Sequence, residues 1–279
     1  MDIRPSPIAG TWYSGDPGGL AGQIDGFLSD GPDPERHGEL IGVIVPHAGH
    51  RYSGAVAGRA FRLARGIMPD IVAVLSPMHS MAPAPVLTSG HEAYQTPLGI
   101  VPVDGAAVRS LSAVLEKRSG IRLHPLRNDR EHSLEIELPF LQRTLGDFRL
   151  LPVMILDQSE STAEAIGSAL AEVLAGRTAL LVGSSDLSHF YPDDVARGLD
   201  AEMMRRVESF DPAGVMRAEE EDAGFACGRA AVAAVLWAAK AMGASAVTNV
   251  AYATSGDVTQ DRSSVVGYGA AAVWRVAPA

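Results

Sequence analysis

The stretch that decides the fold reads Ile41-Gly42-Val43-Ile44-Val45-Pro46-His47-Ala48-Gly49-His50. Its first five residues are apolar or small, which predicts a buried strand. Pro46 ends the ladder of hydrogen bonds because it has no N–H to donate, and Gly49 then allows a tight turn. His47 is therefore expected at the carboxyl end of a strand, where open α/β sheets bind their ligands.

Two more apolar runs end in the same way. Residues 71–75 lead into Ser76-Pro77-Met78-His79, and residues 178–183 lead into Ser184-Ser185-Asp186-Leu187-Ser188-His189. One histidine after a strand more often caps the chain or makes a hydrogen bond than binds a ligand. Three apolar strands that each end in a histidine-bearing loop predict that these loops converge on one pocket.

The composition indicates a globular protein. The chain has 279 residues, of which 47% are hydrophobic and 20% are charged, so it can bury a large core. Residues 53–65 carry small and apolar residues at helical spacing between the strands at 41–45 and 71–75, a βαβ pattern with parallel strands. No repeat or linker divides the chain. We therefore predict an α/β fold with one domain over residues 1–279, in which helices flank a largely parallel or mixed twisted sheet.

Other elements are predicted from periodicity and from end signals. Asp16-Pro17 is expected to open a helix, because Asp caps a helix N-terminus and Pro suits the first helical position. Pro139 is expected to kink a helix at 134–145. Residues 80–97, rich in Pro, Ser and Gly, are expected to form a long irregular excursion. Further helices are expected at 105–118, 160–175, 193–208, 212–218 and 223–242, and further strands at 98–103, 149–156, 246–253 and 264–276.

Charge and cysteine content disfavour several classes of partner. The formal charge of −10 argues against nucleic acid and anionic membranes as main partners. The single cysteine, Cys227, fits a reducing cytoplasm, since no disulfide can form within the chain. The first residues show no signal-peptide pattern, and the apolar run around 230–242 is typical of a buried helix rather than a membrane span. We expect a cytoplasmic protein whose ligand is a small molecule or a peptide.

His47 and His79 are the strongest candidates for metal ligands. Imidazole binds iron, zinc, copper and nickel, and neighbouring strand ends would bring both rings together. A metal site needs a third ligand, and the residues leave that choice open. The candidates are Cys227, Asp186, His189, Glu131, His132 and Glu135. The alternative is that both histidines are uncharged pocket residues without a metal.

Cys227 lies near the expected start of the apolar helix at 223–242. The helix dipole and the nearby Arg229 would favour its thiolate, and a thiolate is a strong ligand for soft metals. A buried structural thiol is the alternative. Trp12 also has two interpretations: it either pins the N-terminal arm to the body or lines a pocket wall.

Two groups of residues could move protons. His189 could act as a general acid or base, with Asp186 three residues earlier fixing its tautomer. Glu131, His132 and Glu135 form a second group, for which capping of the following helix is the alternative.

Familiar catalytic motifs are absent from the sequence. Ser184 and Ser185 lack the G-x-S-x-G elbow of a nucleophilic serine. There is no HExxH, P-loop or CxxC motif. Gly267-Tyr268-Gly269 loosely matches a dinucleotide fingerprint, but too few residues follow it for a helix and a second strand.

Six motifs occur in a distinctive order. They are Ala9-Gly10-Thr11-Trp12-Tyr13, Val45-Pro46-His47-Ala48-Gly49 with Tyr52-Ser53-Gly54, Ser76-Pro77-Met78-His79, Glu131-His132-Ser133-Leu134-Glu135, Ser184-Ser185-Asp186-Leu187-Ser188-His189 and Cys227-Gly228-Arg229. Together they resemble the Memo family, whose prokaryotic members are called AmmeMemoRadiSam system protein B. The resemblance covers nearly the whole chain.

The resemblance implies a fold related to the class III extradiol ring-cleaving dioxygenases, which are non-haem Fe(II) enzymes. It implies that His47, His79 and Cys227 bind a metal, with iron first and copper as an alternative; zinc would accompany a hydrolytic role. In animals the family is linked to phosphopeptide binding.

The same resemblance implies further pocket residues. His132, Asp186 and His189 are expected to line the pocket as catalytic residues, with Trp12 and Tyr52 at its mouth. Arg229, beside the cysteine, is expected to join these two aromatic residues in substrate binding.

One feature departs from the ring-cleaving enzymes. Those enzymes use two histidines and one carboxylate, whereas a thiolate in the third place donates more charge and can itself be oxidised. Three functions follow as hypotheses: a dioxygenase-type oxidoreductase with Fe(II), a binding module for a peptide or small anion, and a metal-assisted hydrolase with His189 as base.

Overall fold

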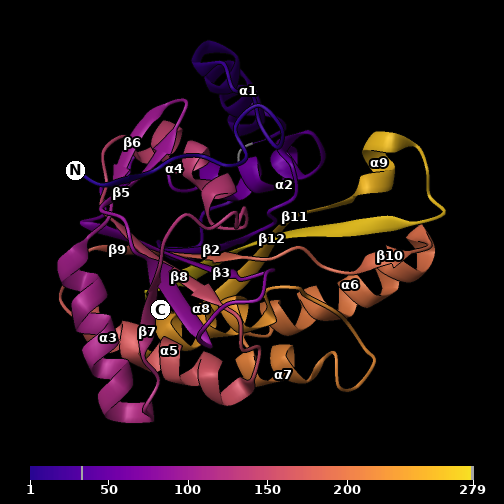
Figure 1. The fold of residues 1–279 in the computed structure, drawn as a ribbon. Helices are drawn as coiled ribbons and strands as arrows, with labels where there is room; N and C mark the ends of the chain where they lie inside the picture. Colours follow the sequence, from indigo (N-terminus) through magenta and orange to yellow (C-terminus); the bar gives the residue numbers. More distant parts are fainter. Residues whose placement is uncertain (33, 278–279) are drawn as a thin grey trace.

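A nine-stranded mixed sheet runs through the residues that the computed structural model describes, 1–32 and 34–277 (Figure 1). The strand order is β10-β12-β2-β9-β3-β8-β4-β7, and β11 pairs with β12. The four central strands β2, β9, β3 and β8 run parallel, while β12 and β4 are antiparallel to their central neighbours. The strands are β2 (Glu39–Val45), β3 (Ile71–Pro77), β4 (Val86–Ser89), β7 (Leu123–Leu126), β8 (Leu150–Ile155), β9 (Ala179–Ser184), β10 (His189–Tyr191), β11 (Ala246–Thr254) and β12 (Val265–Arg275). The predicted α/β fold is confirmed.

Helices cover both faces of this sheet, so the central strands are buried on both sides and are almost purely apolar. One face carries α1 (Pro17–Ser29), α2 (His50–Arg62) and α4 (Leu138–Leu145) (Figure 1). The other carries α3 (Gly105–Ser119), α5 (Glu160–Val173), α6 (Asp193–Glu208), α7 (Pro212–Arg217) and α8 (Arg229–Ala241). Two separate apolar cores result, one on each face.

The predicted start of the first helix is confirmed, but the predicted kink in a later helix is not. Asp16 caps α1, where its side chain accepts a hydrogen bond from the Gly19 N–H, and Pro17 is the first helical residue. The kink predicted at Pro139 is wrong. A 3₁₀ turn, η1 (Glu135–Glu137), comes first and α4 begins at Leu138, so Pro139 lies in the first helical turn, where its missing N–H costs nothing.

The prediction of an irregular excursion at 80–97 is also wrong. This segment contains β4 and β5 (Ala93–Thr96), and β5 pairs with β1 (Ile3–Arg4) and β6 (Gly99–Pro102) in a second, three-stranded sheet. These strands are two to four residues long, and the partners of β1, β4 and β5 include segments distant in the sequence. Local periodicity carries almost no signal for such pairings.

The helix expected from residue 223 begins later, at Arg229. The Cys227 N–H donates to the Asp186 carbonyl oxygen, and the Gly228 N–H donates to Ser185 Oγ. Because these amides bond to the loop after β9, the chain turns here and Cys227 precedes the helix. The short elements β10, β7 and α9 (Ser255–Thr259) were not predicted. Within residues 1–32 and 34–277, no helix combines the length and apolar character that crossing a bilayer requires.

Candidate metal centre

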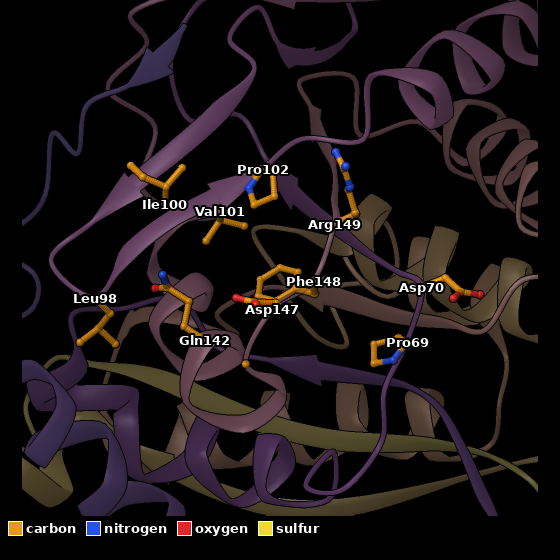
Figure 2. A pocket seen from close by; sticks show the side chains of 11 residues that line it. Pro69, Asp70, Leu98, Ile100, Val101, Pro102, Gln142, Asp147, Phe148 and Arg149 are labelled. Atoms are coloured by element: carbon orange, nitrogen blue, oxygen red, sulfur yellow. The ribbon is translucent and has the colours of Figure 1, made fainter. Parts of the chain in front are cut away.

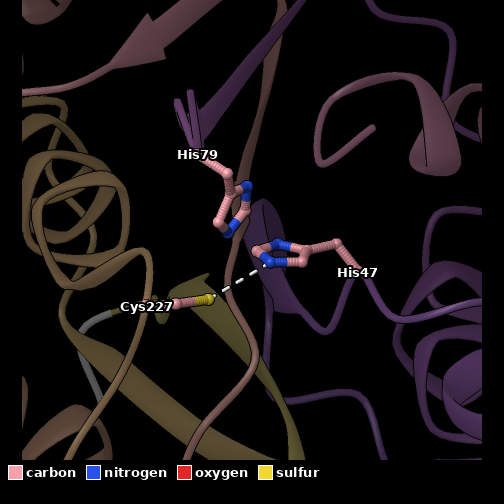
Figure 3. Close-up of side chains that lie close together, drawn as sticks. All are labelled: His47, His79 and Cys227. Atoms are coloured by element: carbon pink, nitrogen blue, oxygen red, sulfur yellow. Dashed lines mark hydrogen bonds between the residues drawn. The ribbon is translucent and has the colours of Figure 1, made fainter. Parts of the chain in front are cut away.

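Three distant segments bring His47, His79 and Cys227 together beyond the carboxyl ends of the central strands. His47 follows β2, His79 follows β3, and β9 lies between these strands. One ligand atom from each residue lies within 4.8 Å of the other two. His47 Nε2 is 3.2 Å from Cys227 Sγ, and the His47 and His79 rings are 5.2 Å apart between centroids (Figure 3).

The His47 ring is held from behind by Ser184. His47 Nδ1 lies 2.9 Å from Ser184 Oγ, which in turn lies 2.7 Å from the Ser133 carbonyl oxygen and 2.9 Å from Glu137 Oε1. Because Nδ1 is engaged there, Nε2 is the nitrogen that faces Cys227. Ser184 therefore serves His47 as a hydrogen-bond partner at the end of β9.

Glu131 holds the second ring. Its carboxylate accepts hydrogen bonds from His79 Nδ1 at 2.9 Å and from the His79 N–H at 2.6 Å. Burial favours the neutral acid, but the bonds from His79 and from the Ser133 N–H hold the pKa of Glu131 well below its usual range. The anion orients His79 and leaves Nε2 of that ring available, as carboxylate partners do in metal sites.

A second group of potential ligands overlaps the first. His79, Glu131 and His132 also place one ligand atom each within 4.8 Å of the others, which would give two histidines and one carboxylate. The Glu131 oxygens, however, already accept from the His79 side chain and from the N–H groups of His79, His132 and Ser133. Oε1 receives three of these four bonds, so the carboxylate is already largely engaged by the chain itself. The set with Cys227 is thus the better donor set.

His47 and His132 are neutral near pH 7. Burial, with the neighbouring His79 second, lowers the pKa of the fully enclosed His47 well below its ordinary value. Burial likewise lowers the pKa of His132 to about 4. Neutral imidazole is the form that binds metal, so neither residue has to lose a proton first.

The expected thiolate of Cys227 is wrong for the metal-free chain. Burial, reinforced by the Asp186 carboxyl, raises the pKa of Cys227. Arg229 does not counter this effect, because its guanidinium pairs with Glu219. Cys227 is therefore a thiol, and its proton has to leave when a metal binds.

Asp186 lies in the cluster, but with a different role from the predicted one. Its Oδ1 accepts from the N–H groups of His47 at 2.7 Å and Ala48 at 3.2 Å, and burial raises the pKa of Asp186 to about 7. His189 Nδ1 lies 2.7 Å from the Leu187 carbonyl oxygen, which accepts its hydrogen. The expectation that Asp186 fixes the His189 tautomer is therefore wrong: Asp186 fixes the backbone at His47.

His132 and Trp12 lie beside the cluster. The His132 ring lies 5.4 Å from the His47 ring and 4.7 Å from the His79 ring between centroids, and Trp12 packs against it at 4.0 Å. Trp12 and Tyr52 are 36% and 37% exposed. The Trp12 carbonyl oxygen also accepts from the His50 N–H at 2.9 Å, so Trp12 both anchors the arm and contacts a pocket histidine.

The candidate Glu135 and the neighbouring His50 lie outside the cluster. Glu135 pairs with the buried Arg4 and accepts from the Tyr13 hydroxyl at 2.6 Å, so it anchors the N-terminal arm. His50, the first residue of α2, is buried against Phe140 and makes a hydrogen bond through Nε2 with the Ile136 carbonyl oxygen. Both residues are structural.

Sequence reasoning missed the supporting roles of Glu131, Ser184 and Glu137. A signal for Glu137 was present, because this acidic residue interrupts the apolar run from Leu134 to Leu141. No local signal could show that Glu131 reaches back to His79 or that Ser184 faces His47. Those contacts join segments 52 and 137 residues apart.

The donor set fits a divalent transition metal. Two imidazoles and one thiol that can ionise suit Fe(II), Cu or Zn. Bonds of about 2.0 Å to nitrogen and 2.3 Å to sulfur place tetrahedral ligand atoms about 3.5 Å apart. The ligand atoms of His47, His79 and Cys227 lie within 4.8 Å of one another, so a small inward movement of these side chains would complete such a site.

Comparisons with known proteins identify relatives over nearly the whole chain. A family model described as Memo-like protein matches residues 4–272. A MEMO1 family protein from Methanothermobacter thermautotrophicus is 35% identical over 276 residues, covering 95% of this chain and 98% of the relative. Another from Methanopyrus kandleri is 36% identical over 279 residues, covering 96% and 97%.

A solved structure shares the fold. The crystal structure of an uncharacterized protein from Escherichia coli K12 superposes with a TM-score of 0.54 at 14% identity, covering 83% of this chain and 99% of that chain. At this level of identity the likeness concerns the fold alone. The family match and the archaeal relatives extend over nearly the full length, and on that basis this chain belongs to the Memo family.

Proposed function

We propose that this protein binds a single non-haem metal ion, with Fe(II) favoured over Cu and Zn, and acts as a dioxygenase-type oxidoreductase. The observation that carries the proposal is the common point faced by His47, His79 and Cys227, with the other nitrogen of each ring already engaged. The carboxyl-end position on an α/β sheet supports it, because such sheets bind ligands there.

The surrounding residues suit proton transfer. His132 is neutral, and its Nδ1 lies 3.2 Å from Glu131, so its other nitrogen can accept a proton from a substrate hydroxyl. His189 donates through Nδ1 to Leu187, which leaves its Nε2 as a second acid or base. Fe(II), when bound, supplies the one-electron and O₂ chemistry that these side chains lack.

The mouth of the site suits a planar ligand. Trp12 packs on His132, and its indole and the Tyr52 ring are each about one third exposed. Exposed aromatic rings beside a polar centre bind planar molecules through stacking. A catechol, with two adjacent hydroxyls, is the simplest probe of this class.

Metal content tests the ligand assignment. In protein purified without oxygen, we expect close to one metal ion per chain, and His47→Ala should abolish it. His124→Ala is the matched control, because His124 is an exposed histidine on β7. Unchanged stoichiometry in His47→Ala would show that the metal, if present, is bound elsewhere. Native zinc in place of iron would favour metal-assisted hydrolysis with His189 as base.

Oxygen consumption separates catalysis from binding. We expect uptake of O₂ when Fe(II)-loaded protein receives at least one member of a panel of catechols. The alternative is a binding module for a peptide or small ligand, which the exposed Trp12 and Tyr52 also favour. A flat oxygen trace for every catechol, together with saturable binding, would favour this module.

A further inference from the structure

Glu137 is a buried carboxyl that the proposed chemistry does not use. Its residue exposure is 1%, its Oε1 lies 2.9 Å from Ser184 Oγ, and its Oε2 has no hydrogen-bond partner. Among residues 1–32 and 34–277, no lysine, arginine or histidine forms an ion pair with it. A buried carboxylate without a cation or a second donor is strongly disfavoured. The placement of this residue therefore needs a reason other than charge pairing.

The hydrogen atoms around Ser184 determine the form of Glu137. Ser184 Oγ has one proton and three close partners: the Ser133 carbonyl oxygen at 2.7 Å, Glu137 Oε1 and His47 Nδ1, each at 2.9 Å. The carbonyl oxygen can only accept, so the Ser184 proton belongs there. The other two contacts then need protons of their own, and an oxygen that donates once and accepts twice is fully used.

This arrangement makes Glu137 a donor. A carboxylate at Oε1 would compete with the carbonyl for the single Ser184 proton, leaving one short oxygen–oxygen contact without hydrogen. The neutral acid avoids this conflict, and it leaves only a carbonyl-type Oε2 unpaired. Burial, with a smaller contribution from the Asp186 carboxyl, raises the pKa of Glu137 well above its usual value, which agrees with the geometry.

We propose that Glu137 is a positioning residue for the metal centre: as a neutral hydrogen-bond donor, it fills one acceptor position of the Ser184 oxygen and, together with the Ser133 carbonyl, fixes the rotation of the Ser184 hydroxyl. The remaining acceptor position then receives His47 Nδ1–H, which leaves His47 Nε2 unprotonated toward Cys227. This inference rests on the proposed metal site for its functional meaning. The two histidines then differ in their hydrogen-bond partners. His79 Nδ1 donates directly to the Glu131 carboxylate, whereas His47 Nδ1 donates to Ser184, which accepts a second hydrogen bond from the neutral Glu137.

Two substitutions separate a hydrogen-bond role from a charge or packing role. Glu137→Gln retains a neutral donor and should leave Co²⁺ affinity, measured by competition titration under argon, within about threefold of wild type. Glu137→Met keeps similar volume without a donor, so the Ser184 hydroxyl loses one of the two contacts that fix its rotation and turns toward His47 in a fraction of the molecules. It should weaken Co²⁺ binding about 10-fold, the lower end for outer partners of metal ligands. Glu131→Gln removes the anion behind His79 and should weaken binding by about 10–100-fold.

Stability provides a second readout. Glu137→Met removes a buried unpaired oxygen, so its thermal midpoint should equal or exceed that of wild type. Weaker metal binding in an equally stable protein is the result that a merely structural role does not produce. Equal weakening of Co²⁺ binding in Glu137→Gln and Glu137→Met would assign the effect to charge. Unchanged Co²⁺ binding in both variants would mean that Glu137 serves only packing. Both outcomes overturn the inference.

The tautomer of His47 tests the inference even if no metal binds. Nitrogen-15 NMR of histidine-labelled, metal-free protein should show His47 as the Nδ1–H tautomer in wild type and in Glu137→Gln. Glu137→Met should show a mixture with the Nε2–H form. Failure of wild type to bind Co²⁺ would sink the proposed metal function, whereas an Nε2–H tautomer in wild type would sink the role of Glu137.

Discussion

The two ends of strand β3 differ in what surrounds them. Beyond its carboxyl end lie His79 and the candidate metal centre, where a buried His47, a half-buried Cys227 and an exposed His79 meet and the other nitrogen of each ring is engaged. Beside its amino end lies a cavity of about 640 Å³ lined by residues such as Leu98, Phe148 and Arg149 (Figure 2). The titratable residues there, Asp70, Asp147 and Arg149, are all exposed.

The large cavity and the residues that could bind a metal therefore lie at opposite ends of the sheet. A wide, solvated hollow leaves its charges with nearly ordinary solvation, whereas burial at the carboxyl end changes the proton affinity of His47, Asp186 and Cys227. Both groups of described residues that could hold a metal lie at the carboxyl end. We propose that convergence of oriented donors, rather than cavity size, marks the functional end.

The largest expected contrast between the two ends is in metal binding. Cys227→Ala removes the sulfur donor, and the loss in Co²⁺ affinity should exceed the 10–100-fold typical of outer partners. Arg149→Ala at the opposite cavity should bind Co²⁺ like wild type. Competition titration of both variants gives the answer, and comparable losses in the two would remove the distinction between the ends.

A buried ion network braces the carboxyl-end side. The Arg4 guanidinium, 2% exposed, pairs with Asp129 and Glu135, which flank the segment that carries Glu131. Arg4→Met would leave two buried carboxylates unpaired and should reduce the free energy of unfolding by about 3–5 kcal/mol. Arg143→Met, which breaks an exposed pair with Asp25 between α4 and α1, should cost less than about 1 kcal/mol. Urea unfolding measures both, and equal costs would contradict the assigned difference.

Metal affinity should increase with pH. The raised pKa of Cys227 means that the metal-free site holds a thiol, so each binding event releases one proton. His47 and His132 add none near pH 7, because burial lowers the pKa of each. We expect Co²⁺ affinity to increase about tenfold per pH unit between pH 6 and 8. A flat profile would mean that Cys227 is already ionised or does not bind.

The smallest expected effect concerns the opposite cavity alone. Asp147→Asn changes an exposed carboxyl there, and the free energy of unfolding should stay within about 0.5 kcal/mol of wild type. Metal content should also be unchanged. A measurable loss of bound metal in Asp147→Asn would show that the cavity influences the metal centre, and it would contradict the distinction between the two ends of the sheet.

Much of the fold was predictable because the central strands are buried on both faces. Apolar runs such as 71–75, followed by histidine-bearing loops, predict both the parallel sheet and the edge where ligands bind. The strands inside 80–97 were not predictable, since β4 and β5 are stabilised by partners elsewhere in the chain. Helix α8 was placed too early because the amides of Cys227 and Gly228 bond to a loop rather than to a helix.

The candidate site divides in the same way. Strand ends predict that His47 and His79 approach each other, but residue pattern alone left the third ligand open, and family resemblance selected Cys227. The contacts that set protonation are tertiary: Glu131 on His79, Ser184 on His47 and the Leu187 carbonyl on His189. Their effect depends on burial, which sequence spacing does not determine.

X-ray absorption of the metal-loaded protein tests the central claim most directly. If two imidazoles and the thiolate bind the ion, the spectrum should contain one sulfur at about 2.3 Å together with imidazole nitrogens at about 2.0–2.1 Å, and the sulfur should disappear in Cys227→Ser. A wild-type shell made only of nitrogen and oxygen would contradict the account.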